Sequence, residues 1–209
     1  MNSAVLGVLL AGGLARRMGG GDKPLRTIGG RTILDHVIER MQRQCAGLIV
    51  NANGDPMRFA PWGMPVVPDS VPGFAGPLAG ILAGMEWAQE EPDITHIVSI
   101  PADTPFLPDD LVKRLETGAR AAGVKLACAA SGGRTHPVIG LWPIALADDL
   151  RHALTVQGER KIDRYTERHG VTAVEWPMDP VDPFFNANEP DDLKTAEKIL
   201  AELLRPRDA

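Results

Sequence analysis

The chain has 209 residues, 44% of them hydrophobic, which is enough for one domain over residues 1–209 with a sizeable core. Its formal net charge is −5, with 22 basic and 27 acidic side chains. Without a basic excess the chain offers no general footprint for a nucleic-acid backbone, so we expect no nucleic-acid partner, although one anion in a local basic pocket stays open.

Short apolar runs alternate with longer amphipathic runs along the chain. In the first half we expect, in order, a strand at 4–10, a helix at 32–44, strands at 47–51 and 65–68, a helix at 77–89 and a strand at 96–100. In the second half we expect a helix at 108–122, strands at 124–130 and 137–141, helices at 145–154 and 160–168, a strand at 171–176 and a helix at 189–204. This alternation predicts an α/β fold with a mostly parallel central sheet flanked by helices on both faces. The stretch 131–182 is less regular and forms either a subdomain or an edge of the sheet.

The cysteines and apolar segments indicate a cytoplasmic protein. Cys45 and Cys128 do not have a metal-ligand spacing, and a domain of this size needs no disulfide, so we expect two reduced thiols. No apolar stretch reaches the roughly 18 residues that span a bilayer. The N-terminal apolar run lacks the positive start of a signal peptide, because its arginines follow the run. We therefore expect no membrane contact.

A glycine-rich segment follows the first predicted strand. Residues 10–23, LAGGLARRMGGGDK, hold five glycines and the three cations Arg16, Arg17 and Lys23. Ligands of open α/β sheets bind beyond the carboxyl ends of the strands. Glycine lets backbone N–H groups approach phosphate oxygens, and the cations supply countercharge. The segment therefore predicts a phosphate cradle.

Two well-known phosphate loops do not fit this segment. A P-loop needs Lys followed by Ser or Thr, whereas Lys23 is followed by Pro24. A dinucleotide fingerprint runs straight into a helix, whereas Pro24 and Gly29–Gly30 interrupt the chain before any predicted helix.

The pattern LAGGxARRMGGxDK resembles the opening signature of the molybdenum cofactor guanylyltransferases. These belong to the nucleotidyltransferase superfamily, which has a Rossmann-like, glycosyltransferase-A-like α/β fold. Further segments resemble the same family in the same order and extend the resemblance over nearly the whole chain: Val50–Asn53, Asp69 with Gly76–Gly80, Pro101–Phe106, Arg134–Pro137 and Phe185–Pro190. The resemblance implies an enzyme that transfers GMP from GTP to the terminal phosphate of molybdenum-molybdopterin, giving molybdopterin guanine dinucleotide and pyrophosphate.

Three polar residues near predicted strand ends are candidates for nucleotide contacts. Asp103 follows the strand at 96–100, where its carboxylate can hold Mg²⁺ against phosphates or simply cap a turn. Asn51 offers both a donor and an acceptor for a base edge or ribose, or serves as a turn residue. Asp69 can accept the N–H donors of guanine or ribose hydroxyls. The resemblance implies a GTP site with magnesium on Asp103, made of Leu10, Ala11, Gly12, Gly13, Lys23, Asn51, Asp69 and Asp103.

The resemblance also implies a molybdopterin side at Gly76, Asn186 and Asn188. The segment from Gly76 opens a predicted helix whose N-terminus favours an anion, and its small residues equally suit tight packing. The two asparagines either face the molybdopterin or cap the last helix. Arg134 and His136 are either substrate-side or architectural, and the stretch 158–161 either adds positive charge for the second ligand or starts a solvated helix. For the charge that develops on the leaving group, we assign Arg17 and Lys23 as the neutralising cations.

Three alternatives stay open. The CTP-dependent molybdenum cofactor cytidylyltransferases are similar but tend to carry LAAG in place of LAGG. A sugar-phosphate nucleotidyltransferase shares the loop and Asp103 but not the NANEP segment, and a non-catalytic cofactor carrier has no need of a metal carboxylate.

We expect a nucleotide-binding half at about 1–105 and a cofactor-substrate half at about 106–209. The expected partners are GTP, molybdenum-molybdopterin and, transiently, molybdoenzyme apoproteins or their chaperones.

Overall fold

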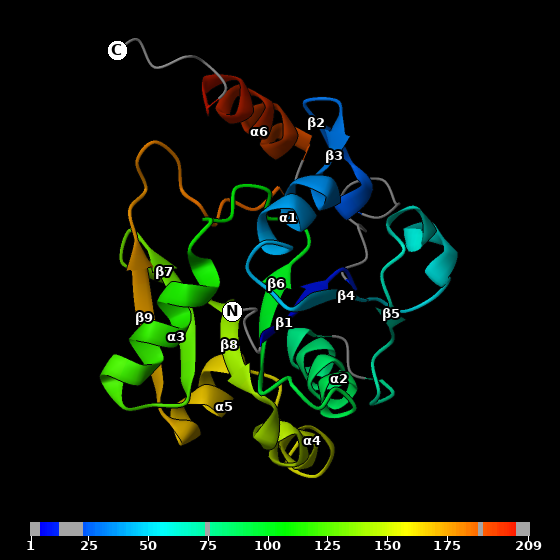
Figure 1. Ribbon diagram of the computed structural model, residues 1–209, viewed down its shortest axis with the longest axis vertical. Helices are drawn as coiled ribbons and strands as arrows, with labels where there is room; N and C mark the ends of the chain where they lie inside the picture. The colour runs from blue at the N-terminus through cyan, green and yellow to red at the C-terminus, as the bar shows by residue number, and fades with distance from the viewer. Residues whose placement is uncertain (1–4, 13–22, 74–75, 188–189, 204–209) are drawn as a thin grey trace.

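A seven-stranded sheet with the order β5-β4-β1-β6-β8-β7-β9 forms the centre of the fold (Figure 1). The structure is a computed structural model that describes residues 5–12, 23–73, 76–187 and 190–203. The strands of this sheet are β1 (Val5–Leu10), β4 (Gly47–Asn51), β5 (Val66–Val67), β6 (His96–Pro101), β7 (Leu126–Ser131), β8 (Arg134–Pro143) and β9 (Val171–Trp176). Strand β8 is antiparallel to both of its neighbours, and the other described pairs in the sheet are parallel. The predicted mostly parallel sheet is therefore confirmed.

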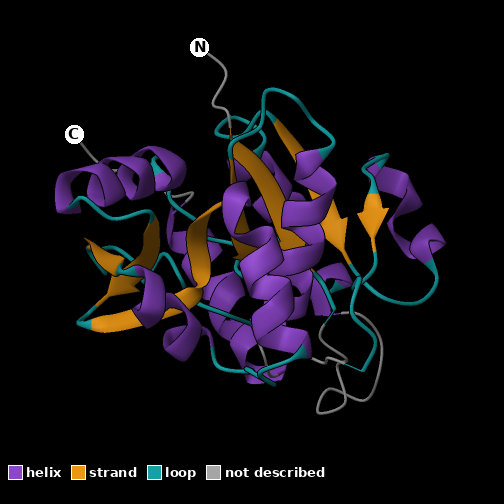
Figure 2. Cartoon of the chain, turned by 90° about the horizontal axis from the view of Figure 1, so that it is seen from below, coloured by secondary structure: helices purple, strands orange, loops and turns teal. Residues whose placement is uncertain are grey.

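Helices cover both faces of the sheet (Figure 2). One face packs against α1 (Ile33–Met41) and α3 (Leu111–Ala122), and the other against α2 (Pro77–Gln89), α4 (Ala147–Thr155) and α5 (Ile162–His169). Helix α6 (Pro190–Leu203) adds Ala196 to the first core and lies against the short strand β2 (Thr27–Ile28). Because successive strand residues point to opposite faces, Val5 and Leu9 of β1 join the first core, and Leu6 and Val8 join the second. Both faces of β1 are thus buried, as expected of a central parallel strand.

The predicted elements match the observed ones with a few shifted ends. The bounds of β4, α2 and β9 agree with the prediction. Strand β8 is longer than the predicted 137–141, since it pairs with β7 back to Arg134 and with β6 as far as Pro143. The stretch 131–182 contributes β8 and the edge strand β9 to the same sheet.

A short hairpin that the sequence prediction did not contain leads into α1. Its strands are β2 (Thr27–Ile28) and β3 (Arg31–Thr32), and it follows the 3-10 helix η2 (Lys23–Leu25). Gly29 and Gly30 connect the strands with φ of +58° and +75°. Two successive positive φ values define the type of two-residue turn that suits a twisted hairpin and needs glycine. The dipeptide Gly29–Gly30 was therefore the available sequence signal.

The start of α1 is closed by a reciprocal cap. The Thr32 hydroxyl accepts from the backbone N–H of Asp35 at 3.0 Å, and the Asp35 carboxylate accepts from the backbone N–H of Thr32 at 2.9 Å. The cap satisfies two N–H groups that no helix carbonyl can reach. It fixes where the helix begins relative to the hairpin and to η2, whose first residue is Lys23.

Both cysteines are free thiols, as expected from the sequence. Across 5–12, 23–73, 76–187 and 190–203, no helix combines the length and apolar character needed to cross a membrane. The remaining 3-10 helices are η3 (Pro56–Trp62) and η4 (Ile144–Leu146).

Candidate functional site

The carboxyl ends of three parallel strands meet at one edge of the sheet. Leu10 at the end of β1 pairs in register with Asn51 of β4 and Pro101 of β6. Two backbone hydrogen bonds continue this alignment past the strands, from Ala11 N–H to the Asn51 carbonyl at 2.9 Å and from Ala102 N–H to the Leu10 carbonyl at 3.1 Å. The structure therefore brings together the described part of the predicted GTP site. Gly13, Arg17 and Asn188 lie outside the described residues.

Asn51 is held in a fixed orientation at this edge. Its side chain is almost fully buried, and its amide nitrogen donates to the Val67 carbonyl at 3.1 Å and to Asp69 Oδ1 at 3.0 Å. A buried amide with these partners cannot rotate freely without leaving polar groups unpaired. Asn51 and Asp69, 18 positions apart in sequence, thus form one polar unit.

Asn53 completes this unit, although sequence reasoning did not select it. Its amide nitrogen donates to Asp69 Oδ2 at 2.8 Å, and its amide oxygen accepts from the backbone N–H of Asp69 at 2.9 Å. The Arg58 guanidinium donates to the Asn53 backbone carbonyl. Each oxygen of the Asp69 carboxylate therefore has one amide donor. The NAN repeat at 51–53 was the available signal, because residues two positions apart in an extended chain face the same side.

Gly80 leaves the space that Asn51 occupies. A Cβ on Gly80 would lie 2.2 Å from Asn51 Oδ1 and 2.8 Å from Leu10 Cδ2. Gly80 belongs to the first turns of α2, which packs against β1 and β4. The small residue that the sequence placed there thus allows close packing against a site residue. Gly76 is the N-cap of the same helix, and a Cβ on it would meet no described atom within 4 Å.

Asp103 lies beyond the end of β6 in a largely buried position. Burial raises the pKa of its carboxyl group, while the Lys23 charge, its own backbone N–H and the Asn186 side chain act in the opposite direction. A buried carboxylate with a nearby lysine is suited to bind a cation together with an anion. The structure therefore places the Lys23 charge near enough to Asp103 to act on its carboxylate.

Asn186 reaches this carboxylate from the far end of the chain. Its side chain makes a hydrogen bond to Asp103, and the next residue, Ala187, donates its backbone N–H to the Asp103 carbonyl at 3.1 Å. Two buried oxygens beside Asp103, Asn186 Oδ1 and Thr104 Oγ1, have no hydrogen-bond partner. Buried oxygens without a hydrogen-bond partner in the protein are available as acceptors for a metal ion or another ligand.

The donor set around Asp103 consists of oxygens, which suit a hard divalent cation. Within the described ranges, no group of three or more His, Cys, Asp or Glu side chains could hold a metal ion by itself. Mg²⁺ is commonly held by one or two carboxylates together with substrate phosphates and water. One carboxylate, neighbouring amide and hydroxyl oxygens and a lysine for the phosphates match that pattern.

His136 is bound within the protein. Its Nε2 lies 2.8 Å from the Ser131 hydroxyl, and burial lowers its pKa. The Ser131 hydroxyl also donates to Asp182 at 2.9 Å. Arg134, at the start of β8, is exposed. The cluster of Ser131, His136 and Asp182 was not visible in the sequence, since its outer members are 51 positions apart.

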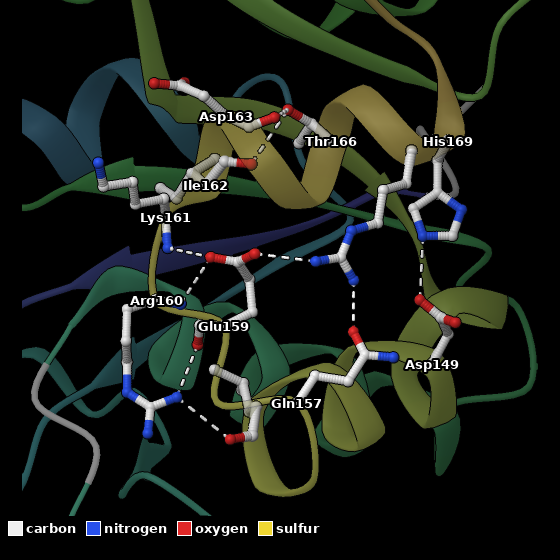
Figure 3. A network of polar contacts seen from close by, with 11 residues as sticks. Asp149, Gln157, Glu159, Arg160, Lys161, Ile162, Asp163, Thr166 and His169 are labelled. Atoms are coloured by element: carbon white, nitrogen blue, oxygen red, sulfur yellow. Dashed lines mark hydrogen bonds and ion pairs between the residues drawn. The ribbon is translucent and has the colours of Figure 1, made fainter.

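The stretch 158–161 forms an internal network between α4 and α5 (Figure 3). The buried Glu159 carboxylate accepts from the backbone N–H groups of Arg160 and Lys161 at 2.9 and 3.0 Å and from Arg168 at 2.9 Å. The backbone hydrogen bonds are the main reason that the pKa of Glu159 is lowered. Helix α5 begins at Ile162 and not at 160 as predicted, because Lys161 has the extended backbone of an N-cap residue. The arginine at 160 donates to the Leu154 and Glu159 carbonyls.

Comparison with known proteins identifies similar sequences and structures over nearly the whole chain. The family model described as MobA-like NTP transferase domain matches residues 7–172. A molybdenum cofactor guanylyltransferase of Bradyrhizobium sp. (strain ORS 278) is 60% identical over 99% of this chain and 97% of that protein. A protein of the same name from Nitrobacter hamburgensis is 57% identical over 93% of this chain and 94% of its own length. Among solved structures, molybdopterin-guanine dinucleotide biosynthesis protein A from Archaeoglobus fulgidus superposes with a TM-score of 0.73 at 25% identity, over 95% of this chain and 99% of that chain.

Proposed function

Because the chain belongs to the MobA-like NTP transferase family, among its molybdenum cofactor guanylyltransferases, we propose the following roles for its residues in that reaction. The enzyme transfers GMP from GTP to molybdenum-molybdopterin and releases pyrophosphate. The observation that carries the residue roles is the meeting of Lys23 and Asn186 at the buried carboxylate of Asp103, beside the end of β1.

The triphosphate of GTP binds at the end of β1. Backbone from Leu10 to Gly13 receives the phosphates, and the Lys23 ammonium neutralises part of their charge. Asp103 holds Mg²⁺, and the bound ion supplies further positive charge to the phosphates. The buried setting of Asp103 supports this role, since electrostatic interactions are stronger away from bulk water.

Guanine binds at the Asn51–Asp69 unit. The Asp69 carboxylate offers acceptor oxygens for the ring N–H and amino group of guanine, whereas cytosine presents an acceptor at its ring nitrogen. The amides of Asn51 and Asn53 hold the carboxylate in one orientation before the nucleotide arrives. Preorganisation of this kind favours a ligand whose donors match the fixed acceptors.

Molybdopterin binds on the side of Asp103 that faces away from the GTP site. Asn186 and Asn188 are assigned to contacts with its phosphate or ring, and Gly76 lies at the N-terminus of α2, which favours an anion. The nucleotide is then held mainly by residues 1–105 and the second substrate mainly by residues 106–209.

Catalysis follows from positioning two anions and neutralising charge. The molybdopterin phosphate is already ionised at neutral pH, so the chain needs no general base to activate it. Arg17 and Lys23 stabilise the negative charge that develops on the leaving pyrophosphate. No side chain forms a covalent intermediate. The chain contributes orientation and electrostatic stabilisation, which together account for large rate enhancements.

Pyrophosphate release with molybdopterin and either GTP or CTP tests the proposal. We expect GTP to be preferred, turnover to require Mg²⁺, and Asp103→Ala to lose turnover while its circular dichroism spectrum stays unchanged. A preference for CTP would overturn the guanine assignment. A fully active Asp103→Ala variant would remove Asp103 from the mechanism.

The location and partners of the enzyme are also part of the proposal. The product must reach enzymes that use it, so transient contacts with molybdoenzyme apoproteins or their chaperones are expected, in the cytoplasm. Cross-linking of the product-loaded enzyme to an apoenzyme tests this contact.

A further inference from the structure

We propose that Ser131, His136 and Asp182 form a positioning relay that holds Asn186 against Asp103. The proposal rests on the function of Asp103 as the metal-binding carboxylate. None of the three relay residues touches the nucleotide site itself, so they act through the segment that carries Asn186.

The relay joins three separate parts of the chain. Ser131 is the buried last residue of β7, His136 belongs to β8, and Asp182 lies in the segment after β9. The Ser131 hydroxyl oxygen is 2.8 Å from His136 Nε2 and 2.9 Å from Asp182 Oδ1. Both distances are those of good hydrogen bonds.

The direction of the protons follows from the chemistry of the groups. An ionised carboxylate only accepts, so the single hydroxyl proton of Ser131 points to Asp182. The hydroxyl oxygen must then accept the proton of His136 Nε2. In a hydrolytic triad the histidine lies between serine and acid and removes the serine proton. Here the serine lies between the other two, so the cluster positions groups and does not activate a nucleophile.

Asp182 connects the relay to a tight turn, which begins at Asp182 itself. The same Oδ1 that accepts from Ser131 also accepts the backbone N–H of Phe184 at 3.0 Å, and the Asp182 carbonyl accepts from Phe185 at 3.1 Å. The buried Phe184 ring packs against the His136 ring, with the centroids 4.9 Å apart. The turn is therefore held at both its backbone and its aromatic side chain.

The turn delivers Asn186 to Asp103. The Phe185 ring lies against Phe106 with centroids 6.2 Å apart, Asn186 bonds to the Asp103 carboxylate, and Ala187 bonds to the Asp103 carbonyl. Shifting the turn would move the Asn186 amide away from the carboxylate. Groups that orient a metal ligand are typically worth about 10- to 100-fold in metal affinity.

Ser131→Ala removes the centre of the relay, and Ser99→Ala is its matched control. Ser99 is also a buried strand serine, with its hydroxyl donating to the Val138 carbonyl at 2.6 Å and accepting from Trp142 Nε1 at 2.8 Å. Both variants delete a buried hydroxyl that accepts from a ring N–H and donates to an oxygen, and the Ser99 hydroxyl also lies 3.4 Å from the Gly140 carbonyl. Only Ser131 is connected to the turn at 182–187.

Two substitutions at Asp182 test the relay independently, because one should break its hydrogen bonds and the other should preserve them. Asp182→Asn retains an oxygen that can accept from both Ser131 and Phe184, whereas Asp182→Ala retains none. Asp182 is only half buried, so Asp182→Ala replaces Ser131→Ala if the latter does not fold.

Direct binding of Mn²⁺ to each variant without nucleotide is the measurement, and it is followed through the loss of the electron paramagnetic resonance signal of the free ion. We expect Ser131→Ala and Asp182→Ala to weaken Mn²⁺ binding about tenfold, and Ser99→Ala and Asp182→Asn to stay within about twofold of wild type. Equal binding by Ser131→Ala and Ser99→Ala would overturn the relay, and so would a tenfold loss in Asp182→Asn.

Asp103→Asn separates this proposal from the proposed function. If Asp103→Asn binds Mn²⁺ as tightly as wild type, the metal site is elsewhere and the relay proposal is overturned together with it. If Asp103→Asn loses Mn²⁺ while Ser131→Ala retains it, only the relay is overturned.

Discussion

Gly80→Ala should impair GTP binding by displacing Asn51. The added Cβ would lie 2.2 Å from Asn51 Oδ1 and 2.8 Å from Asn51 Cγ, closer than any real contact of this kind. The helix backbone of α2 cannot move away easily, because its other side is packed against α4. The Asn51 side chain must therefore move, although its own surroundings are buried.

The cost can be worked out from the bonds that Asn51 makes. Moving its amide breaks the hydrogen bond to the Asp69 carboxylate, worth about 1.5–3 kcal/mol, and the one to the Val67 carbonyl, worth about 0.5–1.5 kcal/mol. Alanine returns about 1 kcal/mol through its higher helix propensity. The variant should thus lose about 2 kcal/mol of unfolding free energy.

Steady-state kinetics and urea unfolding measure the two effects separately. We expect the KM for GTP to rise about tenfold, since one lost hydrogen bond is worth roughly 1.4 kcal/mol, while the KM for molybdopterin changes little. Gly118→Ala is the matched control. It also adds a Cβ within a helix, 2.5 Å from the side chain of Val174. Val174 is half buried and lies on the edge strand β9, far from the nucleotide-binding edge in strand order. Its KM for GTP should equal that of wild type.

A double-mutant cycle with Asn51→Ala decides whether the two positions are coupled. Once Asn51 is truncated, the remaining close contact of the added Cβ is with Leu10 Cδ2, the end of a flexible side chain, so the second substitution should add little to the first. Full additivity of the two effects on the KM for GTP, or a wild-type KM in Gly80→Ala, would refute the reasoning.

Three other changes test separate parts of the structure. Because burial holds the pKa of Asp103 above its value in the unfolded chain, the ionised group disfavours folding. The free energy of unfolding should therefore fall as the pH rises from the pKa of Asp103 in the unfolded chain to its pKa in the folded protein. Asp103→Asn should remove this dependence, abolish Mg²⁺-dependent pyrophosphate release and leave the Tm equal or higher in a calorimetric scan; a lower Tm would contradict the burial argument. Asp69→Asn should lower kcat/KM for GTP by roughly 100-fold, because a carboxylate acceptor becomes a donor, and an unchanged value would remove Asp69 from base recognition. Thr32→Ala should lower the Tm by about 2–4 °C through loss of the α1 cap, with unchanged turnover; slower turnover would show that the α1 cap also supports the active site.

The local pattern of apolar and polar residues was sufficient to predict the helices and strands. It also predicted the edge of the sheet at which polar residues follow the strands. Strands β4 and β9 and helix α2 have the predicted bounds because apolar periodicity and a proline or glycine mark their ends within the segment itself. Asn51 and Asp103 could be assigned to one edge because parallel strands share the direction of their carboxyl ends. The hairpin at Gly29–Gly30 was missed although its turn signal was present.

The pairing of groups at the site was decided by tertiary structure. Asn53 bonds to Asp69 from 16 positions away, and Ser131 bonds to Asp182 from 51 positions away. Such contacts depend on which strands are neighbours and on where the connecting turns return. Strand order is set by packing of the whole sheet and its helices, which no local window of sequence contains. The sequence by itself therefore determined the chemical groups and the sheet edge that carries them, and only the folded chain decided which of those groups hold one another in place.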